Sequence, residues 1–392
     1  MSAAVGADIV ALPLAGGGTE PYRLRETVAW PKPATPARSR VAYAAAHVVP
    51  DVRGDNGPGR PAVLDWDSTL GFRRHLFSYG LGVAEAMDTA QRNMGLDWPA
   101  TQELIRRSAA EARSAGAALC AGAGTDQLPP EARSLDEVAD AYEEQLAVVE
   151  DAGATPVLMA SRQLAKLANK PEDYLTVYDR VLRQVRGPVI LHWLGTMFDP
   201  HLAGYWGSDD LAEATATVIA LIHDHADVVD GIKTSLLDPV HEAGLRRGLP
   251  SGVRVYTGDD FHYQELIEGD ENGHSDALLG AFAAIAPAAA AGLAALDAGD
   301  HDAYAAAIGP TVPLSRHVFS APTQYYKTGI AFLSWLAGHQ PGFVMVGGLQ
   351  SARGVVHLAE AFRLADTAGL LPDPALAASR MRAFLTVNGV AQ

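Results

Sequence analysis

The stretch Asp227 to Asp238, with the sequence DVVDGIKTSLLD, decides the fold of this chain. An apolar run ends in a single lysine, Lys233, which is followed by the polar pair Thr234 and Ser235. Lysine is rarely buried without a partner, and burial disfavours the ammonium form and frees the amine as a nucleophile. The stretch therefore predicts a buried strand whose end presents an amine able to form a Schiff base with a carbonyl substrate. The alternative is that Lys233 is simply the first solvated residue after a core strand.

The rest of the chain repeats this pattern, because from Arg40 onward short apolar runs alternate with amphipathic segments of helical length. Such alternation is typical of βαβ units and a parallel sheet. Eight strands in about 250 residues predict an α/β fold of the (β/α)8 TIM-barrel type. An open doubly wound sheet is the alternative, but no glycine-rich nucleotide-binding motif follows an early strand. The expected strands are Val41 to Val49, Gly80 to Ala84, Ala117 to Ala121, Thr155 to Ala160, Pro188 to Leu191, Val228 to Ile232, Val253 to Tyr256 and Ala277 to Phe282.

Helices are expected between these strands and in two extensions of the barrel. Several are introduced by Ser, Asp or Pro, among them Pro99 to Ala115, Leu135 to Ala152 and Ser208 to Ala226. Residues 1–39 predict an N-terminal extension, a small hairpin around Gly16 to Gly18 followed by a proline-rich linker. We expect residues 40–287 to form the barrel. Residues 288–392 predict a C-terminal helical region that includes helices at Leu314 to His339 and Ala352 to Ala368.

Composition excludes several classes of function. The chain has 392 residues, 48% of them hydrophobic and 19% charged, which is enough to bury a large core. A formal charge of -16 repels phosphate backbones and anionic lipids, so we expect neither nucleic acid nor membrane as a partner. The one cysteine, Cys120, cannot form an internal disulfide, and the chain lacks a secretory signal and an apolar run of about 18 residues. A cytoplasmic location is the expectation.

Polar residues follow most of the expected strands. Active sites of TIM barrels lie at the carboxyl ends of the strands, so these residues are candidates for substrate contact and catalysis. Each could instead cap a helix or form a turn, and a histidine at such a place is often a hydrogen-bonded core residue. The candidates are His47 after the first strand, Glu85 and Asp88 after the second, Arg162 after the fourth, His192 after the fifth, Lys233, Thr234 and Ser235 after the sixth, and Asp259 after the seventh.

Three motifs in order along the chain resemble the dihydrodipicolinate synthase and N-acetylneuraminate lyase superfamily of Schiff-base aldolases. They are PVILH at Pro188 to His192, GIK at Gly231 to Lys233 and GDD at Gly258 to Asp260, and the segment Glu144 to Pro156 adds to the likeness. The resemblance covers roughly residues 40 to 350. It implies that Lys233 is the Schiff-base lysine, that the substrate is a small carbonyl compound, and that no cofactor is needed. Together with the apolar C-terminal helices it implies a homo-oligomer, a dimer or a tetramer.

The sequence also departs from that superfamily. The second strand usually ends in GTTGE, whose hydroxyls and amides help hold the carboxylate of pyruvate, whereas here Val83 and Ala84 stand where threonines are expected. The family tyrosine that relays a proton aligns with His192, and an imidazole can transfer protons nearer neutral pH than a phenol. The chain therefore resembles a divergent branch whose substrate differs from the usual one.

The expected chemistry is that of a class I aldolase or lyase. The neutral amine of Lys233 attacks a ketone, and the resulting iminium acts as an electron sink while an adjacent carbon–carbon bond breaks or forms, or water is eliminated. His192 is the expected proton shuttle. The expected substrate-binding residues are His47, Thr234 and Ser235 for hydroxyl groups, Glu85 and Asp88 for orienting a sugar-like chain, Arg162 for a carboxylate, and Asp259 at the seventh strand end.

Two other readings stay open. In the first, the chain is a metal-dependent barrel isomerase or epimerase, with Lys233 in an electrostatic role; the ligands would be His47, Glu85, His192, Asp259 and His262. None of these five residues stands in an HxH or HExxH motif, so no metal is expected. In the second, the barrel binds a ligand without catalysis, because fold does not fix function.

Overall fold

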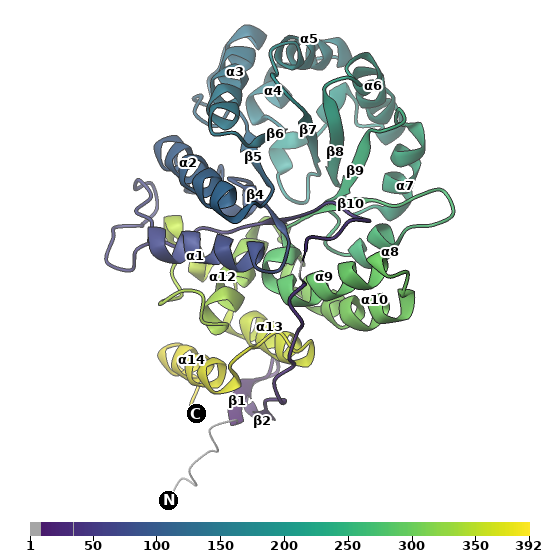
Figure 1. Ribbon diagram of the computed structural model, residues 1–392. Helices are drawn as coiled ribbons and strands as arrows, with labels where there is room; N and C mark the ends of the chain where they lie inside the picture. The colour runs from purple at the N-terminus through teal and green to yellow at the C-terminus, as the bar shows by residue number, and fades with distance from the viewer. Residues whose placement is uncertain (1–8, 34) are drawn as a thin grey trace, which may run out of the picture.

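Eight parallel strands close into a barrel in the computed structural model, which describes residues 9–33 and 35–392 (Figure 1). Each strand pairs with the next along the chain, and the last strand pairs with the first to close the sheet. The strands are β3 (Ala42–Ala45), β4 (Gly82–Glu85), β5 (Leu119–Ala123), β6 (Thr155–Leu158), β7 (Val189–Leu194), β8 (Val229–Ser235), β9 (Arg254–Thr257) and β10 (Asp276–Leu279). The fold is the (β/α)8 TIM barrel that the alternation predicts, with strand ends a few residues from those expected.

Helices between the strands cover the outside of the barrel (Figure 1). The side chains of Asp97, Ser134 and Asp210 accept hydrogen bonds from backbone N–H groups of the first turns of α2, α3 and α6, which is why the chain turns helical at these points. The helices are α1 (Trp66–Phe77), α2 (Trp98–Ala115), α3 (Leu135–Asp151), α4 (Arg162–Leu167), α5 (Pro171–Leu182), α6 (Leu211–Asp224), α7 (Pro239–Gly248) and α8 (Tyr263–Glu268).

Alternate residues of each strand point into the barrel or toward the helices. The inward side chains form a small buried cluster of their own, separate from the large cluster between strands and helices. Its members are Tyr43, Ala45, Ala84, Met87, Cys120, Val157, Met159, Ile190, Tyr256 and Leu278. A shift of one residue at a strand end therefore decides whether a polar side chain faces the barrel interior or the helix layer.

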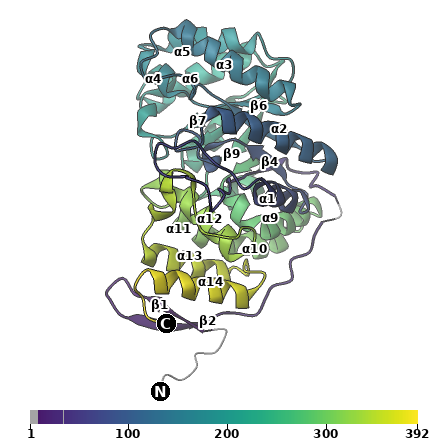
Figure 2. The ribbon, with the colours of Figure 1, turned by 90° about the vertical axis from the view of Figure 1, so that its left-hand side faces the viewer.

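The N-terminal hairpin packs against the C-terminal helices. Strands β1 (Ile9–Pro13) and β2 (Thr19–Arg23) pair antiparallel, and β1 contacts α13 (Val355–Thr367) and α14 (Pro374–Val387). Figures 1 and 2 show the hairpin beside these two helices, at the end of the molecule away from α3 to α6. The Tyr22 hydroxyl donates to a carboxylate oxygen of Asp366 at 2.6 Å. The two ends of the chain thus form one packed unit.

One expected helix is wrong. The segment Leu314 to His339 forms two helices, α11 (Val312–Val318) and α12 (Tyr326–Leu336), rather than one. Pro322 lies between them, and proline has no N–H to donate and disfavours helical conformation in the residue before it. Because of the break, α12 begins afresh at Tyr326, whose hydroxyl lies 2.8 Å from that of Thr89, just beyond β4.

After β10 the chain continues into α9 (Ala281–Asp297) and α10 (His301–Ile308), which lead to the C-terminal helices. The boundary expected at residue 287 falls inside α9, which is bent at Ile285, two residues before Pro287. Within the described part of the chain, none of the helices combines the length and apolar character needed to cross a membrane.

Candidate active site

Lys233 lies inside the barrel near the carboxyl end of β8. Strands β7 and β8 pair with His192 opposite Lys233, so both side chains point to the same face. The Lys233 Nζ atom lies 3.0 Å from His192 Nε2 and donates to Ser235 Oγ at 2.6 Å. All three side chains are buried. The structure thus brings together three of the residues that the sequence nominates.

Gly231 of the GIK motif and Gly258 of the GDD motif lack a side chain, which would collide with the atoms around Lys233. A Cβ atom on Gly231 would lie 2.8 Å from Cε2 of Tyr256, whose ring fills the barrel below Lys233. A Cβ atom on Gly258 would lie 2.9 Å from Lys233 Nζ and 2.2 Å from Ser235 Oγ. Since real Cβ atoms keep a larger separation, glycine at position 258 lets the backbone of β9 approach the lysine amine closely.

Burial controls the charge state of the pair. Desolvation lowers the pKa of Lys233, while the nearby acidic groups, chiefly Asp88 and Asp260, oppose that shift. Burial and the charge of Lys233 together hold the pKa of His192 well below its usual value. His192 is therefore a neutral imidazole at pH 7. Its Nδ1 atom lacks a hydrogen-bond partner among the residues described.

Asp260, rather than Asp259, is the carboxyl group near Lys233. Burial raises the pKa of Asp260 to about 8. Two effects oppose this rise: the Ala281 N–H donates a hydrogen bond to Asp260 Oδ1 at 2.9 Å, and the charge of Lys233 favours the carboxylate. This carboxyl group is therefore largely protonated at neutral pH. Asp259 instead accepts from the backbone N–H of Phe261 and pairs with His262 Nδ1 at 2.9 Å.

Three other nominated side chains connect the barrel to its helix layer. His47 Nε2 lies 2.8 Å from Gln340 Oε1, beyond the end of α12. Glu85 accepts two hydrogen bonds of 2.8 Å from Arg73 of α1, and both side chains are fully buried. Thr234 donates to Glu242 of α7 at 2.8 Å. The structure does not bring these residues to the Lys233 amine.

Burial raises the pKa of Glu242 to about 7, although the hydroxyls of Thr234, Thr257 and Ser275 hydrogen-bond to it. It lies outside the barrel wall. Its hydrogen bonds tie β8, β9 and the residue before β10 to α7.

The five side chains that would be the ligands of a metal-dependent isomerase do not lie close together. His47 and Glu85 have partners in the helix layer, and the Asp259–His262 pair is a local contact. Among the described residues, no group of three or more His, Cys, Asp or Glu side chains has the arrangement of a metal site.

The mouth of the barrel holds Asp88 and Arg162 together with Lys327, which sequence reasoning missed. A narrow pocket there is lined by Asp88, Arg92, Asn93, Met94, Arg162, Phe198, Asp199, Gln324, Tyr326 and Lys327. Lys327, from the first turn of α12, is buried, and desolvation lowers its pKa to about 8. The signal in the sequence is a lysine two residues before the mainly apolar run Gly329 to Leu336. The charge of Asp88, which lines the same pocket as Lys327, raises the pKa of both Lys233 and Lys327.

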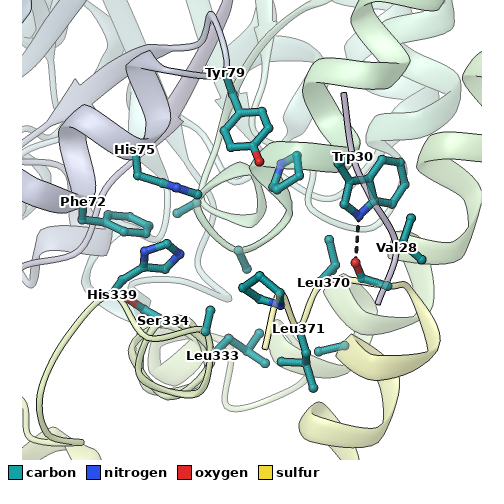
Figure 3. A pocket seen from close by; sticks show the side chains of 17 residues that line it. Val28, Trp30, Phe72, His75, Tyr79, Leu333, Ser334, His339, Leu370 and Leu371 are labelled. Atoms are coloured by element: carbon teal, nitrogen blue, oxygen red, sulfur yellow. Dashed lines mark hydrogen bonds between the residues drawn. The ribbon is translucent and has the colours of Figure 1, made fainter. Parts of the chain in front are cut away.

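A separate cavity of about 100 Å³ lies outside the barrel (Figure 3). Trp30, Phe72, His75 and His339 contribute to its wall, and the Trp30 indole N–H donates to the carbonyl of Gly369 at 2.7 Å. The described residues that line it come from α1, α9, α12, α13 and the segments beside them, and none belongs to a barrel strand. The candidate active site is therefore the barrel interior and not this cavity.

Comparisons with known proteins agree with the geometry. No curated protein matches the sequence. Among solved structures, dihydrodipicolinate synthase from Aquifex aeolicus shares 12% identity with a TM-score of 0.63, over 85% of this chain and 99% of that chain. The synthase from Bacteroides thetaiotaomicron shares 15% identity with a TM-score of 0.63, over 83% and 99%. A prophage protein of E. coli K12 from the dihydrodipicolinic acid synthase family, in complex with pyruvate, shares 15% identity with a TM-score of 0.62, over 90% and 99%.

These likenesses establish the fold and show that it is shared with the superfamily that the motifs resemble. Each of the three relatives is matched along 99% of its own length, while part of this chain lies outside each match. The family model described as "Protein of unknown function (DUF993)" matches residues 10–390. Because that match spans nearly the whole chain, the protein belongs to the DUF993 family.

Proposed function

We propose that this protein is a class I aldolase or lyase that forms a Schiff base between Lys233 and a ketone of a small-molecule substrate. One observation carries the proposal: a buried lysine with a lowered pKa contacts His192 and Ser235 at the carboxyl end of a barrel strand. That edge of a TIM barrel is where active sites lie. The shared fold with a family member solved in complex with pyruvate adds support.

The covalent step follows from the neutral amine. Lys233 Nζ attacks the carbonyl carbon, a C–N bond forms, and the carbonyl oxygen takes up a proton to give a carbinolamine. Loss of that oxygen as water, with one more proton, leaves an iminium ion. The iminium accepts the electron pair of an adjacent carbon–carbon bond as it breaks, or of a carbon–hydrogen bond before β-elimination of water. In cleavage, the departing fragment becomes a carbonyl compound as its hydroxyl loses a proton, and the resulting enamine takes up a proton on carbon; in elimination, the enamine expels the β-hydroxyl with a proton as water. Water then hydrolyses the iminium, which releases the carbonyl product and the amine of Lys233.

Two neighbours are suited to move these protons. His192 is neutral and lies 3.0 Å from Nζ, so it can accept a proton from the amine during attack. Asp260 carries a proton at neutral pH because burial raises its pKa to about 8, so it can donate one to the departing hydroxyl. Ser235 Oγ fixes the position of the amine. Asp88 and Arg162 at the mouth are the proposed substrate-binding side chains.

Reductive trapping tests the proposal. The protein is incubated with a panel of ketones and borohydride, and intact mass and peptide mapping locate any adduct. We expect an adduct on Lys233 that is absent from Lys233→Ala and retained in Lys166→Ala, an exposed lysine of α4 whose Nζ donates to the Pro130 carbonyl. Failure of the wild-type protein to trap any ketone would reject the Schiff-base function.

The family resemblance also supports a cytoplasmic homo-oligomer, a dimer or a tetramer. Sedimentation velocity of the full chain measures that state directly. A single species at the mass of one chain would reject the oligomer.

A further inference from the structure

A second buried lysine stands at the mouth of the barrel, and the mechanism above gives it no task. The Lys327 side chain is 2% exposed, and its Nζ donates to the sulfur of Met94 at 3.1 Å. The ring of Tyr326 lies 5.2 Å away. Within residues 9–33 and 35–392, no oxygen atom accepts a hydrogen bond from this amine and no carboxylate lies within ion-pair distance of it.

The fold does not need a cation at this position. A thioether is a weak acceptor, so the buried ammonium is poorly satisfied. Lys327 is also the second residue of α12, and a positive charge in the first turn opposes the helix dipole, which favours anions there. The following residues of α12 are mainly apolar, and a methionine would fill the same place without the cost of burying a charge. The charge is therefore best explained by a ligand.

Most hydrogen-bond donors of the cationic side chains around Lys327 already have an acceptor. Arg92 is held by Asp126, and Arg162 donates through Nε to Asp199 at 2.6 Å. Among the described residues, the Nη atoms of Arg162 have no acceptor, and the Arg162 side chain, which lines the pocket, is about one third exposed. Among the described residues that line this pocket, the uncommitted cationic donors are thus the Lys327 ammonium and the outer N–H groups of Arg162, beside the neutral amides of Asn93 and Gln324.

The space beside them fits part of an anionic group. The enclosed volume is about 10 Å³, which is room for one water molecule or one oxygen atom, and the pocket opens toward solvent. An oxygen of a carboxylate or phosphate could sit there while the rest of the group remains at the open side. The N-terminus of α12 would add its partial positive charge.

We propose that Lys327, with Arg162, binds an anionic group of the substrate, a carboxylate or a phosphate, at the end remote from the carbonyl carbon. This inference rests on the Schiff-base function proposed above and specifies its substrate class. Asp88 lines the same pocket as Lys327, and its charge also raises the pKa of Lys233, which relates this anion subsite to the reacting amine. The subsite would supply charge recognition where Val83 and Ala84 replace hydroxyl residues.

Matched ketone pairs test the inference by borohydride trapping at Lys233. Dihydroxyacetone phosphate is compared with dihydroxyacetone, and 4-oxopentanoate with 2-pentanone. Wild-type protein should reach half-maximal adduct at an about tenfold lower concentration of the anionic member of at least one pair, as a charge-assisted contact would give. The pair that shows the preference identifies the anion as phosphate or carboxylate.

Two variants locate the preference. Lys327→Met should lose the preference for the anionic ketone, measured as the ratio of half-maximal concentrations within each pair, and Arg162→Gln should lose part of it. Lys166→Met is the matched control and should keep it. Because Arg162 is partly exposed, Arg162→Gln carries the test if Lys327→Met fails to fold.

The outcomes separate the two proposals. If wild-type protein traps neutral and anionic ketones equally, or if both variants keep the preference, the anion subsite is rejected while the adduct on Lys233 upholds the Schiff-base function. If wild-type protein forms no adduct at all, the Schiff-base function falls and the subsite with it. An adduct on Lys327 instead of Lys233 would overturn both assignments.

Discussion

At the scale of single residues, the two buried lysines differ in their partners. Lys233 has a neutral imidazole and a hydroxyl beside its amine, which suits a nucleophile that must lose its proton. Lys327 has only a thioether, and with a pKa of about 8 it stays mostly protonated at neutral pH, which suits anion binding. The same burial therefore serves two purposes, and the neighbouring atoms decide which.

Gly258→Ala should disable the reacting amine. The added Cβ would meet Ser235 Oγ, the carbonyl oxygen of Thr234 and Lys233 Nζ, so the lysine and its partner must shift. We expect the rate of adduct formation on Lys233 to fall by about a hundredfold, since a displacement of about 1 Å has that effect on catalysis. Gly187→Ala is the control, because its Cβ would meet no atom within 4 Å. Equal rates for the two variants would contradict the assigned geometry.

Lys327→Met should stabilise the protein at neutral pH. Burial lowers the pKa of Lys327 from 10.5 to about 8, so the unfolded chain binds more protons between these values and the cost of the buried charge is present in full below about pH 8. The variant should gain up to about 3 kcal/mol in free energy of unfolding near pH 7. That gain should shrink as the pH rises from about 8 toward 10.5. Urea unfolding at both ends of the window measures it, and a gain independent of pH would show that packing alone is responsible.

At the scale of elements, helix α1 is joined to β4 by a buried ion pair between Arg73 and Glu85. Arg73 also donates to the carbonyls of His47 and Thr69, so one guanidinium ties α1 to the ends of two neighbouring strands. The side chains lie in the helix layer because Glu85 points outward while Ala84, one residue earlier, points into the barrel. Glu85 therefore supports the barrel wall.

Arg73→Met should destabilise the protein strongly. It leaves the carboxylate of Glu85 buried without its partner, which costs about 3–5 kcal/mol. The double variant Arg73→Met/Glu85→Gln should recover part of that loss, because the second change removes the unpaired charge. Urea unfolding of the single and double variants at constant pH gives both values. A double variant no more stable than the single one would mean that the carbonyl contacts of Arg73 carry the effect.

The barrel and the contact between His192 and Lys233 were predictable because they depend on local order. Each strand pairs with the next along the chain, so PVILH and GIK on successive strands place His192 beside Lys233. Which way a polar residue points at a strand end was not predictable, since adjacent residues point to opposite sides, as Asp259 and Asp260 do and as Lys233 and Thr234 do. Lys327 was missed for another reason. It reaches Met94 across 233 residues of sequence, and no local pattern encodes such a contact.

At the scale of the whole molecule, α12 connects two sites that are distant in sequence. Its first turn brings Tyr326 and Lys327 to the barrel mouth, and the chain beyond its last turn reaches His47 through Gln340. Helices α13 and α14 pack on α12, and the N-terminal hairpin packs on both. The terminal segments of the chain thus pack around α12, the helix that carries the proposed anion subsite.

Deleting residues 1–25 should loosen this support without removing the reacting lysine. Val10 and Leu12 are buried, and Asp366 loses the hydroxyl of Tyr22 and the N–H of Arg25. We expect roughly 3–6 kcal/mol less local stability in α13 and α14 from the two aliphatic side chains alone. Hydrogen exchange should therefore rise in these helices more than in the barrel strands.

Borohydride trapping on Lys233 tests whether the deletion of residues 1–25 leaves the candidate active site intact. In the shortened chain, the adduct of dihydroxyacetone on Lys233 should form as in wild type, because His192 and Ser235 lie on barrel strands that the hairpin does not touch. Tyr22→Phe removes only one hydroxyl and should give a smaller change in the exchange of α13, about 1 kcal/mol. If exchange rises equally in β3 to β10, the barrel and the terminal unit unfold as one cooperative body, and stability of the active site then depends on the hairpin as well.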